Sequence, residues 1–439
     1  MPLPSSAEKL RAAMPIPAAA SPAASDPVPP LTVRGEARFW RISFALFLSG
    51  LATFALLYCV QPMLPAFVRA FSLTPAAASL SLSVATAVLA VAMFGAGALS
   101  DAYGRKTVMA ISLAAAAAAT LAAAFAPNWP TLIVLRALTG LALSGAPAIA
   151  MAYLAEEMDR SAVGLSMGLF IAGNTLGGMG GRLAAAAMAE FWGWRSAMGV
   201  IGAVSLVCAA AFTFALPRER RATPKAELIA IGPAIRMHLG DPGLRLLYAL
   251  SFLLMGAFVT TYNYIGFHLA APPFSLSQTA IGFVFVIYLL GAVASAVAGD
   301  LAGRYGRRQV ILPAVAFMPL GVLVTLSSSL SVTIFGVAMV TVGFFAGHSI
   351  ASSWVGLRIQ TAHAQASALY LFFYYAGSSL AGWAGGWALA ADSWSGVAAF
   401  LSGLTGLALI VAARLRRVAP PAHLQAQTEP APGLLPPPS

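Results

Sequence analysis

Residues 97–106 of the chain read GALSDAYGRK, and residues 299–308 read GDLAGRYGRR. Both segments follow a long apolar run and contain a glycine directly followed by two basic residues. A second pair of segments lies further along, because residues 173–181 (GNTLGGMGG) are matched by residues 377–385 (GSSLAGWAG). The two separations, 202 and 204 residues, are nearly equal. The sequence therefore indicates a chain built from two similar halves.

The composition around these segments excludes a soluble protein. Of the 439 residues, 59% are hydrophobic and only 9% are charged, and the mean hydropathy is +0.83. Soluble domains carry about 25% charged residues, and a chain this apolar cannot stay solvated as a disordered polymer. The solvent that suits it is a lipid bilayer. The two cysteines, Cys59 and Cys208, lie within apolar runs and predict neither a disulfide framework nor a metal site.

Apolar runs of about 20 residues, the length that crosses a bilayer as a helix, recur along the chain. Backbone polar groups in lipid must be bonded internally, and runs without polar alternation predict helices rather than barrel strands. We therefore expect an all-α membrane protein with twelve transmembrane helices in two six-helix halves. The predicted spans are residues 42–60, 76–99, 108–126, 131–154, 163–189, 196–216, 244–269, 279–301, 310–326, 332–354, 366–391 and 396–413.

Polar segments divide the chain further. Residues 1–38 are rich in Pro, Ala and Ser and predict a disordered cytoplasmic tail, and residues 414–439 predict a second one. The two halves are expected at 39–216 and 244–413, joined by a charged cytoplasmic loop at 217–243.

The distribution of Lys and Arg predicts the orientation in the membrane. With the N-terminus inside, Arg69 and Arg195 fall in external loops and Arg136 and Arg182 inside spans, which leaves 21 of the 25 on the cytoplasmic side. This is the positive-inside pattern, and it places both termini in the cytoplasm. The net charge of +11 then faces the anionic inner leaflet and does not indicate nucleic-acid binding.

The repeat and its motifs resemble those of one transporter superfamily. Internal repeats of this kind are typical of secondary transporters, whose halves rock around a central site. Residues 97–106 match at every key position the loop signature of the major facilitator superfamily, Gly-x-x-x-Asp-x-x-Gly-Arg-Lys/Arg. The resemblance implies contacts that close the cytoplasmic side in the outward-facing state. The predicted gate residues are Gly97, Asp101, Gly104, Arg105, Lys106, Glu156, Glu157, Gly306, Arg307 and Arg308.

Within this gate, two contacts are expected from charge. Asp101 can face the positive N-terminal end of the span that begins near Ala366. Arg105 can pair with either glutamate at the inner end of the fourth span. The second copy of the motif departs from the signature, because Gly303 stands where the aspartate would map. Equivalent closing contacts of the second copy are therefore not expected in the second half.

Two spans resemble the superfamily's drug–proton antiporters. Arg136 and Gly140 in the fourth span fit the Arg-x-x-x-Gly signature of those proteins. In the fifth span the signature's proline is replaced by Gly178 and its last glycine by Arg182. Glycines at four-residue spacing let helices approach closely, so packing alone is the alternative interpretation. The glycines that keep the antiporter spacing are Gly164, Gly173, Gly177 and Gly181.

Three further stretches resemble the YnfM-type, or acriflavine-sensitivity, subfamily: residues 51–62 (LATFALLYCVQP), 346–349 (AGHS) and 370–375 (YLFFYY). The resemblance covers about residues 38–415 and implies a bacterial inner-membrane efflux carrier for dyes or similar small molecules. No Gly-x-x-x-x-Gly-Lys-Ser/Thr loop and no catalytic or metal-ligand cluster appears, so no nucleotide, cofactor or enzyme activity is expected. The expected partners are the lipid bilayer, a small-molecule substrate and protons, and the expected state is a monomer.

Polar residues inside the spans mark a candidate cavity. All 14 acidic residues fall in tails, loops or span ends, and arginine does not titrate in proteins. His348 is therefore the predicted carrier of a coupling proton, with the two gate glutamates as rivals and a histidine bonded between helices as the alternative. Polar side chains in spans usually face a cavity. The predicted cavity residues are Gln61, Asn174, Tyr262, Asn263, His348, Tyr370 and Tyr374.

Together these patterns predict export of a drug- or dye-like molecule by proton antiport with alternating access. The tyrosines suit planar or amphipathic cargo. The two span arginines, which have no acidic partner in the spans, favour organic anions or sugars, so the class of cargo stays open. A non-transporting membrane sensor is a remoter alternative, because the loop at 217–243 is short for an output domain.

Overall fold

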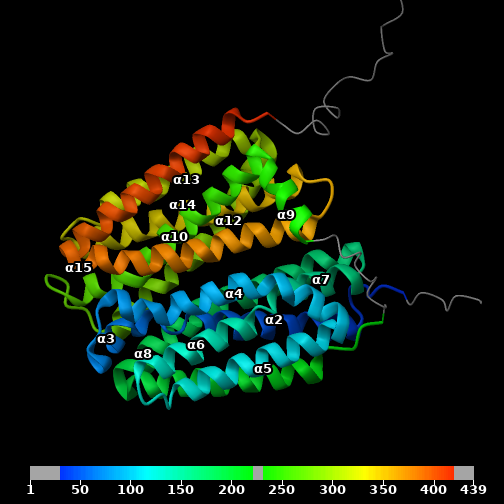
Figure 1. Ribbon diagram of the computed structural model, residues 1–439, viewed down its shortest axis with the longest axis horizontal. Coiled ribbons are helices and arrows are strands. Elements are labelled where there is room, and N and C mark those ends of the chain that lie inside the picture. Colours follow the sequence, from blue (N-terminus) through cyan, green and yellow to red (C-terminus); the bar gives the residue numbers. More distant parts are fainter. Residues whose placement is uncertain (1–29, 221–230, 420–439) are drawn as a thin grey trace, which may run out of the picture.

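A computed structural model describes residues 30–220 and 231–419 as a bundle of helices (Figure 1). The first half contains α2 (Ala37–Tyr58), η1 (Gln61–Met63), α3 (Leu64–Phe71), α4 (Pro75–Tyr103), α5 (Arg105–Ala123), α6 (Trp129–Leu143), α7 (Pro147–Glu157) and α8 (Arg160–Ala215). Helix α9 (Ile231–Gly240) precedes the second half. The second half contains α10 (Pro242–Ala270), α11 (Gln278–Gly282), η2 (Phe283–Ile287), α12 (Tyr288–Tyr305), α13 (Arg307–Val324), α14 (Leu330–Arg358) and α15 (His363–Arg417).

The described helices account for twelve crossings of a membrane. Nine helical stretches in the described ranges are long and apolar enough to span one. Two of these, α8 and α15, are each two spans, because the backbone leaves the helical conformation at Gly193 and at Asp392–Ser393. The shorter α6, followed by α7, supplies the remaining crossing. The expectation of an all-α membrane protein with twelve spans in two halves is confirmed.

Two predicted spans are not continuous α-helices. The span predicted at 131–154 is broken between α6 and α7, where the N–H groups of Ser144 and Gly145 bond to carbonyls three residues back. Pro147 then begins α7, because proline has no N–H to donate and fits the first turn of a helix. The span predicted at 279–301 begins with the short α11 and the 3₁₀ segment η2 before α12.

Three predicted segment boundaries also differ, because tertiary partners order segments whose local composition indicates loop. Residues 30–38, predicted as the end of a tail, are held where the backbone of Thr32 bonds to Glu157 and Asp159. Helix α9 lies within the predicted central loop, and α15 extends four residues into the predicted second tail, to Arg417. Residues 1–29, 221–230 and 420–439 of the predicted tails and loop lie outside the described residues.

Local chemistry explains where several helices begin. Thr74, Asn128, Asp241 and Ser277 each precede a helix and accept a hydrogen bond from a backbone N–H of its first turn. These N–H groups have no partner within the helix, so a capping oxygen stabilises each start. Three of the four helices, those after Thr74, Asn128 and Asp241, also carry a proline in the first two positions.

The glycines of the fifth span allow α8 to lie directly on α2. A side-chain carbon on Gly173 would overlap the carbonyl oxygen of Phe47, and one on Gly177 would overlap that of Leu51. Gly181 meets the backbone of α2 in the same way. Only hydrogen at these positions lets the two backbones approach this closely. The glycine spacing is therefore a packing device in this structure.

The same device recurs elsewhere in the bundle. Gly377 of α15 lies against the carbonyl oxygen of Phe252 in α10, the equivalent contact of the second half. Gly140 of α6 lies against the carbonyl of Ala85 in α4. Packing of helix on helix through glycine is thus shared by both halves.

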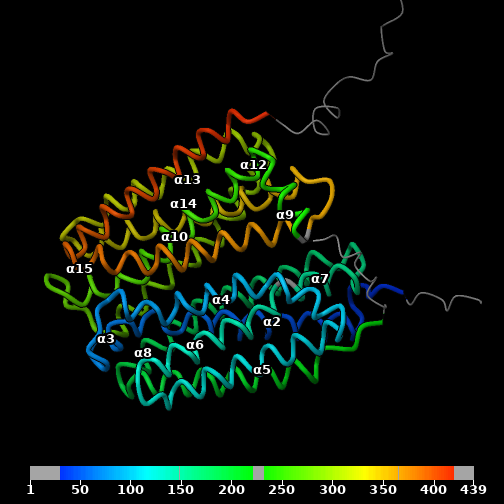
Figure 2. Tube along the Cα trace, in the orientation of Figure 1, coloured from blue at the N-terminus to red at the C-terminus, as the bar shows by residue number. Residues whose placement is uncertain are grey.

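The two halves diverge toward the end that holds α7 and α9, as the ribbon and the Cα trace both show (Figures 1 and 2). We call this the basic end; it comprises residues 30–38, 103–107, 156–161, 217–220, 300–308 and 358–363. The opposite end comprises residues 69–75, 190–195 and 271–278. Hydrogen bonds that join the halves lie away from the basic end: Gln61–Asn263, Gln278–Pro62, Thr279–Glu190 and Ser379–Ser83.

Candidate functional site

At the basic end of the first half, part of the predicted gate forms an ion-pair cluster. Gly104 turns the chain with φ +87°, a conformation that favours glycine, and α5 begins at Arg105. The guanidinium of Arg105 donates to both carboxylate oxygens of Glu156, at 2.6 Å from Nε and 2.5 Å from Nη2. Asp101 lies 3.8 Å from the same guanidinium. Of the two glutamates, Arg105 therefore pairs with Glu156.

Glu157 belongs to a different pair. Its carboxylate, only 4% exposed, accepts from Nη2 of Arg38 at 2.6 Å and from the backbone N–H of Arg220 at 2.8 Å. The backbone N–H of Lys106 donates to Glu219 at 2.7 Å. The bonds to Glu157 attach the start of α2 and the start of the central loop to the end of α7, and the bond to Glu219 attaches the same loop to the start of α5.

The predicted contact between Asp101 and the following half is not formed in this conformation. Among the contacts of the described residues, Asp101 is joined to Arg105 and not to the first turn of α15. That helix begins at His363, after Ala362 in a left-handed conformation. A side-chain carbon on Gly97 would also meet only open space. The halves stand apart here, which fits a contact expected only when this end is closed.

The second copy of the motif keeps the turn but not the charges around it. Gly306 has φ +85° and ψ 141°, nearly the values of +87° and 142° at Gly104. Arg307 donates to the hydroxyl of Ser353 at 3.2 Å, and Arg308 donates to the carbonyl of Val418. The nearby pair of Arg304 and Asp300 is exposed to solvent.

In the described part of the second half, one partly buried ion pair lies at this end. Arg358, at the end of α14, donates to both carboxylate oxygens of Asp241 at 3.1 and 3.0 Å. Asp241 also accepts from the N–H of Leu244 at 2.7 Å and so caps α10. Although partial burial acts to raise the pKa of Asp241, the hydrogen bonds from Arg358 and from the backbone outweigh it and hold that pKa below its usual value.

Arg136 is fully buried and is bonded to backbone alone. Its guanidinium donates to the carbonyls of Ser81 at 2.9 Å, Leu56 at 2.9 Å and Leu57 at 2.7 Å. The last two carbonyls belong to the final turn of α2, just before the helix is interrupted. A buried charge is tolerated only when its donors are satisfied, and here carbonyl oxygens satisfy them. Arg136 thus ties α6 to α2 and α4.

Between the halves lies a cavity of about 390 Å³, which we call the central cavity. Of the predicted cavity residues, Asn174, His348 and Tyr374 line it. Seven of its eighteen lining residues are Phe or Tyr, and among its lining residues Arg182 is the one with a permanent charge. The lining residues are Phe54, Tyr58, Ile171, Asn174, Thr175, Gly178 and Arg182 from the first half, and Met255, Phe258, Val259, Tyr288, Ser295, Phe344, Phe345, His348, Ser349, Ser352 and Tyr374 from the second.

Arg182 is held in this wall by neutral groups. Its Nε donates to Oε1 of Gln61 at 2.6 Å, and its Nη1 donates to the carbonyl of Gly178 at 2.6 Å. The guanidinium carbon lies 4.2 Å from the centre of the Tyr58 ring and 4.8 Å from that of Tyr288. The faces of aromatic rings attract cations, so the two tyrosines stabilise the charge from both halves.

His348, in α14, lines the central cavity from the second half. Its Nδ1 is 2.9 Å from the hydroxyl of Tyr370, so this tyrosine stands behind the histidine and does not line the cavity. The imidazole stacks on Phe344, with ring centres 5.7 Å apart and planes at 9°. Tyr374 lies on a further side, 4.9 Å away between ring centres.

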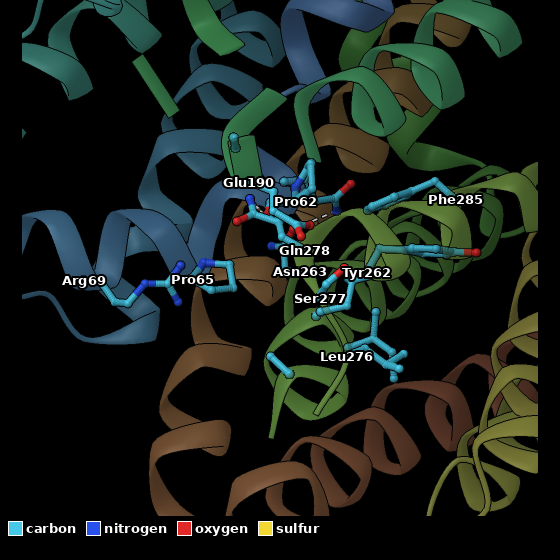
Figure 3. A pocket seen from close by; sticks show the side chains of 16 residues that line it. Pro62, Pro65, Arg69, Glu190, Tyr262, Asn263, Leu276, Ser277, Gln278 and Phe285 are labelled. Carbon is cyan, nitrogen blue, oxygen red and sulfur yellow. Dashed lines mark hydrogen bonds between the residues drawn. The ribbon is translucent and has the colours of Figure 1, made fainter. Parts of the chain in front are cut away.

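The remaining predicted cavity residues lie in a second pocket of about 450 Å³, toward the opposite end (Figure 3). Gln61, Tyr262 and Asn263 line it. Nε2 of Gln61 donates to Oδ1 of Asn263 at 2.8 Å, which links the halves. Glu190 accepts from the N–H of Thr279 at 2.6 Å and closes a further link at the first turn of α11. The sequence did not single out Glu190, because a glutamate at a span end is common.

The order and content of the two halves match one protein family. The sequence profile described as the Major Facilitator Superfamily matches residues 42–271 and 246–437. The chain belongs to this superfamily. Its members carry small molecules across membranes, so the protein is a membrane transporter, and the predicted family is confirmed.

Relatives and a solved structure agree with this membership. Inner membrane transport protein YnfM of Escherichia coli (strain K12) is 46% identical over 387 residues, which cover 88% of this chain and 92% of that protein. The uncharacterized MFS-type transporter YybF of Bacillus subtilis (strain 168) is 44% identical over 385 residues, 88% and 95% of the two chains. A bacterial homolog of the human lysosomal transporter Spinster, crystallised inward-facing and unoccupied, shares the fold with a TM-score of 0.70 and 14% identity, over 87% of this chain and 96% of that one.

Proposed function

We propose that the protein exports a small molecule from the cytoplasm across the bacterial inner membrane by alternating access. The observation that carries the proposal is the central cavity, because both halves line it. The halves are bonded together toward the opposite end and diverge toward the basic end (Figure 1). A site so placed is reached from one end at a time. The basic end faces the cytoplasm by the positive-inside rule, so cargo enters from there in this conformation.

Proton entry drives this export in our proposal, and His348 takes up the proton. Among the described residues that line the central cavity there is no carboxylate, so the imidazole of His348 is the group there whose ordinary pKa lies nearest to physiological pH. Its bond to Tyr370 fixes the ring. The rival carriers, Glu156 and Glu157, are each engaged with an arginine at the basic end.

His348→Gln tests the coupling. In proteoliposomes we expect the variant to lose accumulation driven by a pH gradient and to keep downhill exchange of cargo, because the cavity persists without its titratable group. Tyr370→Phe is the matched control, since it removes the hydroxyl that holds the ring but leaves the imidazole, and it should keep coupled transport. Full pH-driven accumulation by His348→Gln would contradict the role of His348 and point to the two glutamates.

The aromatic wall supports planar or amphipathic cargo of the drug or dye type. Phe258 and Phe344 stack with ring centres 3.9 Å apart, and Phe345 meets Phe258 edge to face. Such walls give a ligand's rings a large apolar contact area and favourable stacked or edge-to-face geometry. Ligand stabilisation of the purified protein, screened across cationic dyes, organic anions and sugars, tests the class, because a ligand that binds the folded state raises the unfolding midpoint. Stabilisation by sugars alone would overturn the aromatic class.

A further inference from the structure

Arg182 stands where the other half of the molecule has glycine. The fifth and eleventh spans align at a separation of 204 residues, which pairs Gly181 with Gly385 and Arg182 with Gly386. A side-chain carbon on Gly386 would overlap the backbone of Ala76 in α4. The packing of α15 against α4 of the first half therefore requires a glycine at this place, whereas at the equivalent place the first half projects a guanidinium into the central cavity.

The charge of Arg182 is not neutralised by an acidic group of the cavity. Its side chain is nearly fully buried, and the residues that line the central cavity include no aspartate or glutamate. Its described contacts are the amide oxygen of Gln61, one backbone carbonyl and aromatic rings. These groups are neutral, so the cavity keeps a net positive potential. Burial of a charge is favourable only with a compensating partner, and an anionic ligand supplies one.

The geometry of the guanidinium leaves part of it for a ligand. Nε and Nη1 are committed to Gln61 and Gly178, whereas a guanidinium carries five N–H donors in a planar fork. A carboxylate matches such a fork better than any single neutral acceptor. Tyr58 of the first half and Tyr288 of the second both lie against the guanidinium, with ring centres 4.2 and 4.8 Å from its central carbon, so contacts from both halves hold it before a ligand arrives.

From this juxtaposition we infer that the cargo is a small aromatic carboxylate, with its carboxylate on Arg182 and its ring against the wall of Phe258 and Phe344. This inference rests on the proposed function and names the substrate class of the same cavity. At about 390 Å³ the cavity suits a ligand of one or two fused rings. A cationic dye of the same size is disfavoured, because it meets the buried positive charge with no acidic group to offset it.

The test uses the full chain in detergent and three probes of one shape: naphthalene carboxylate, its neutral carboxamide and naphthylmethylammonium. We expect the carboxylate to bind at least about tenfold more tightly than the carboxamide, in line with a charge-assisted hydrogen bond, and the ammonium to bind most weakly. Arg182→Gln should abolish the preference for the carboxylate. Arg182→Lys should keep part of it, because the charge remains. Arg245→Gln, which removes an exposed arginine of α10, should leave the preference unchanged.

Each other result overturns the inference. Equal binding of carboxylate and carboxamide, tightest binding of the ammonium, or binding of none of the three would do so. Should Arg182→Gln fail to fold, the order of the three probes on the wild type and on Arg182→Lys decides the question. Counterflow of an unrelated cargo in proteoliposomes separates the two proposals. If that cargo is transported while the carboxylate does not bind, the substrate class fails and the transporter function stands.

Discussion

Two ion pairs at the basic end occupy equivalent places in the two halves, with their signs exchanged. Arg38 and Glu157 precede Asp241 and Arg358 by 203 and 201 residues, close to the spacing of the internal repeat. Each pair ties the start of the first span of its half to the end of the fourth, at 2.6 Å in the first half and 3.0 Å in the second. The attraction between two opposite charges does not depend on which helix carries which charge. The two halves therefore share the ion pair at this place although the residues that form it differ.

The surroundings of the two pairs differ. Next to the first pair, Arg105 and Glu156 form a second, partly buried bidentate pair. At the matching place in the second half, Arg307 has a serine hydroxyl instead. The basic end of the first half is therefore more heavily cross-linked by charge. We expect charge removal there to have the larger effect.

Glu157→Gln should give the largest loss. The carboxylate is buried and serves both Arg38 and the backbone of Arg220. Removal of one partner from a buried pair costs about 3–5 kcal/mol, because the other charge is left uncompensated. The free energy of unfolding in mixed micelles titrated with SDS measures it. Arg304→Gln, in an exposed pair of the second half, should cost at most about 1 kcal/mol. Equal losses would contradict the asymmetry.

Arg105→Gln and Arg307→Gln compare the two copies of the motif directly. The first removes two hydrogen bonds to a carboxylate, and such bonds contribute about 1.5–3 kcal/mol. The second removes one bond to a hydroxyl, which contributes about 0.5–1.5 kcal/mol. The same SDS titration checks the order. If Arg307→Gln proved the more destabilising, the second copy would not be the weaker one.

Acid should weaken the pair of the second half over a defined range. Since the pKa of Asp241 is lowered in the folded protein, its stabilisation is fully present above the ordinary value of about 3.9. It is lost as the pH falls through the lower folded value. The difference in melting temperature between wild type and Asp241→Asn should therefore be largest near neutral pH and shrink in acid. A difference in melting temperature that grew as the pH fell would mean that folding raises the pKa of Asp241, and it would contradict the prediction.

Asp101→Asn should give the smallest effect on stability and shift a conformational equilibrium instead. Asp101 has only Arg105 as a described charged partner here, so we expect its contact with the start of α15 only in a closed form of this end. An acidic group at a helix N-terminus contributes about 0.3–1 kcal/mol, enough for a shift of severalfold. Spin-label distances across the basic end measure it, with Asp300→Asn as the matched control. Identical distance distributions in wild type and Asp101→Asn would argue against a closing contact between Asp101 and the start of α15.

Part of the candidate site could be predicted because polar groups are rare in apolar spans. Of the predicted cavity residues, Asn174, His348 and Tyr374 line the central cavity, whereas Gln61 and Asn263 lie in the pocket toward the opposite end. The phenylalanines of the wall and Tyr288 were not predicted, since Phe258, Phe344 and Tyr288 look in sequence like any other aromatic residues of the spans. Which face of a helix meets a cavity depends on its rotation against its neighbours.

The sequence by itself determined that the protein lies in a membrane, that it has twelve spans and that it is a duplication. These properties depend on hydropathy, charge and repeat spacing, which are arranged along the chain and need no partner. Only the tertiary structure decided which groups the two arginines buried in spans contact. Arg136 meets the carbonyls that end α2, whereas Arg182 meets aromatic rings and a cavity. The surroundings of a buried charge are set by helices distant in sequence, and no local pattern encodes them.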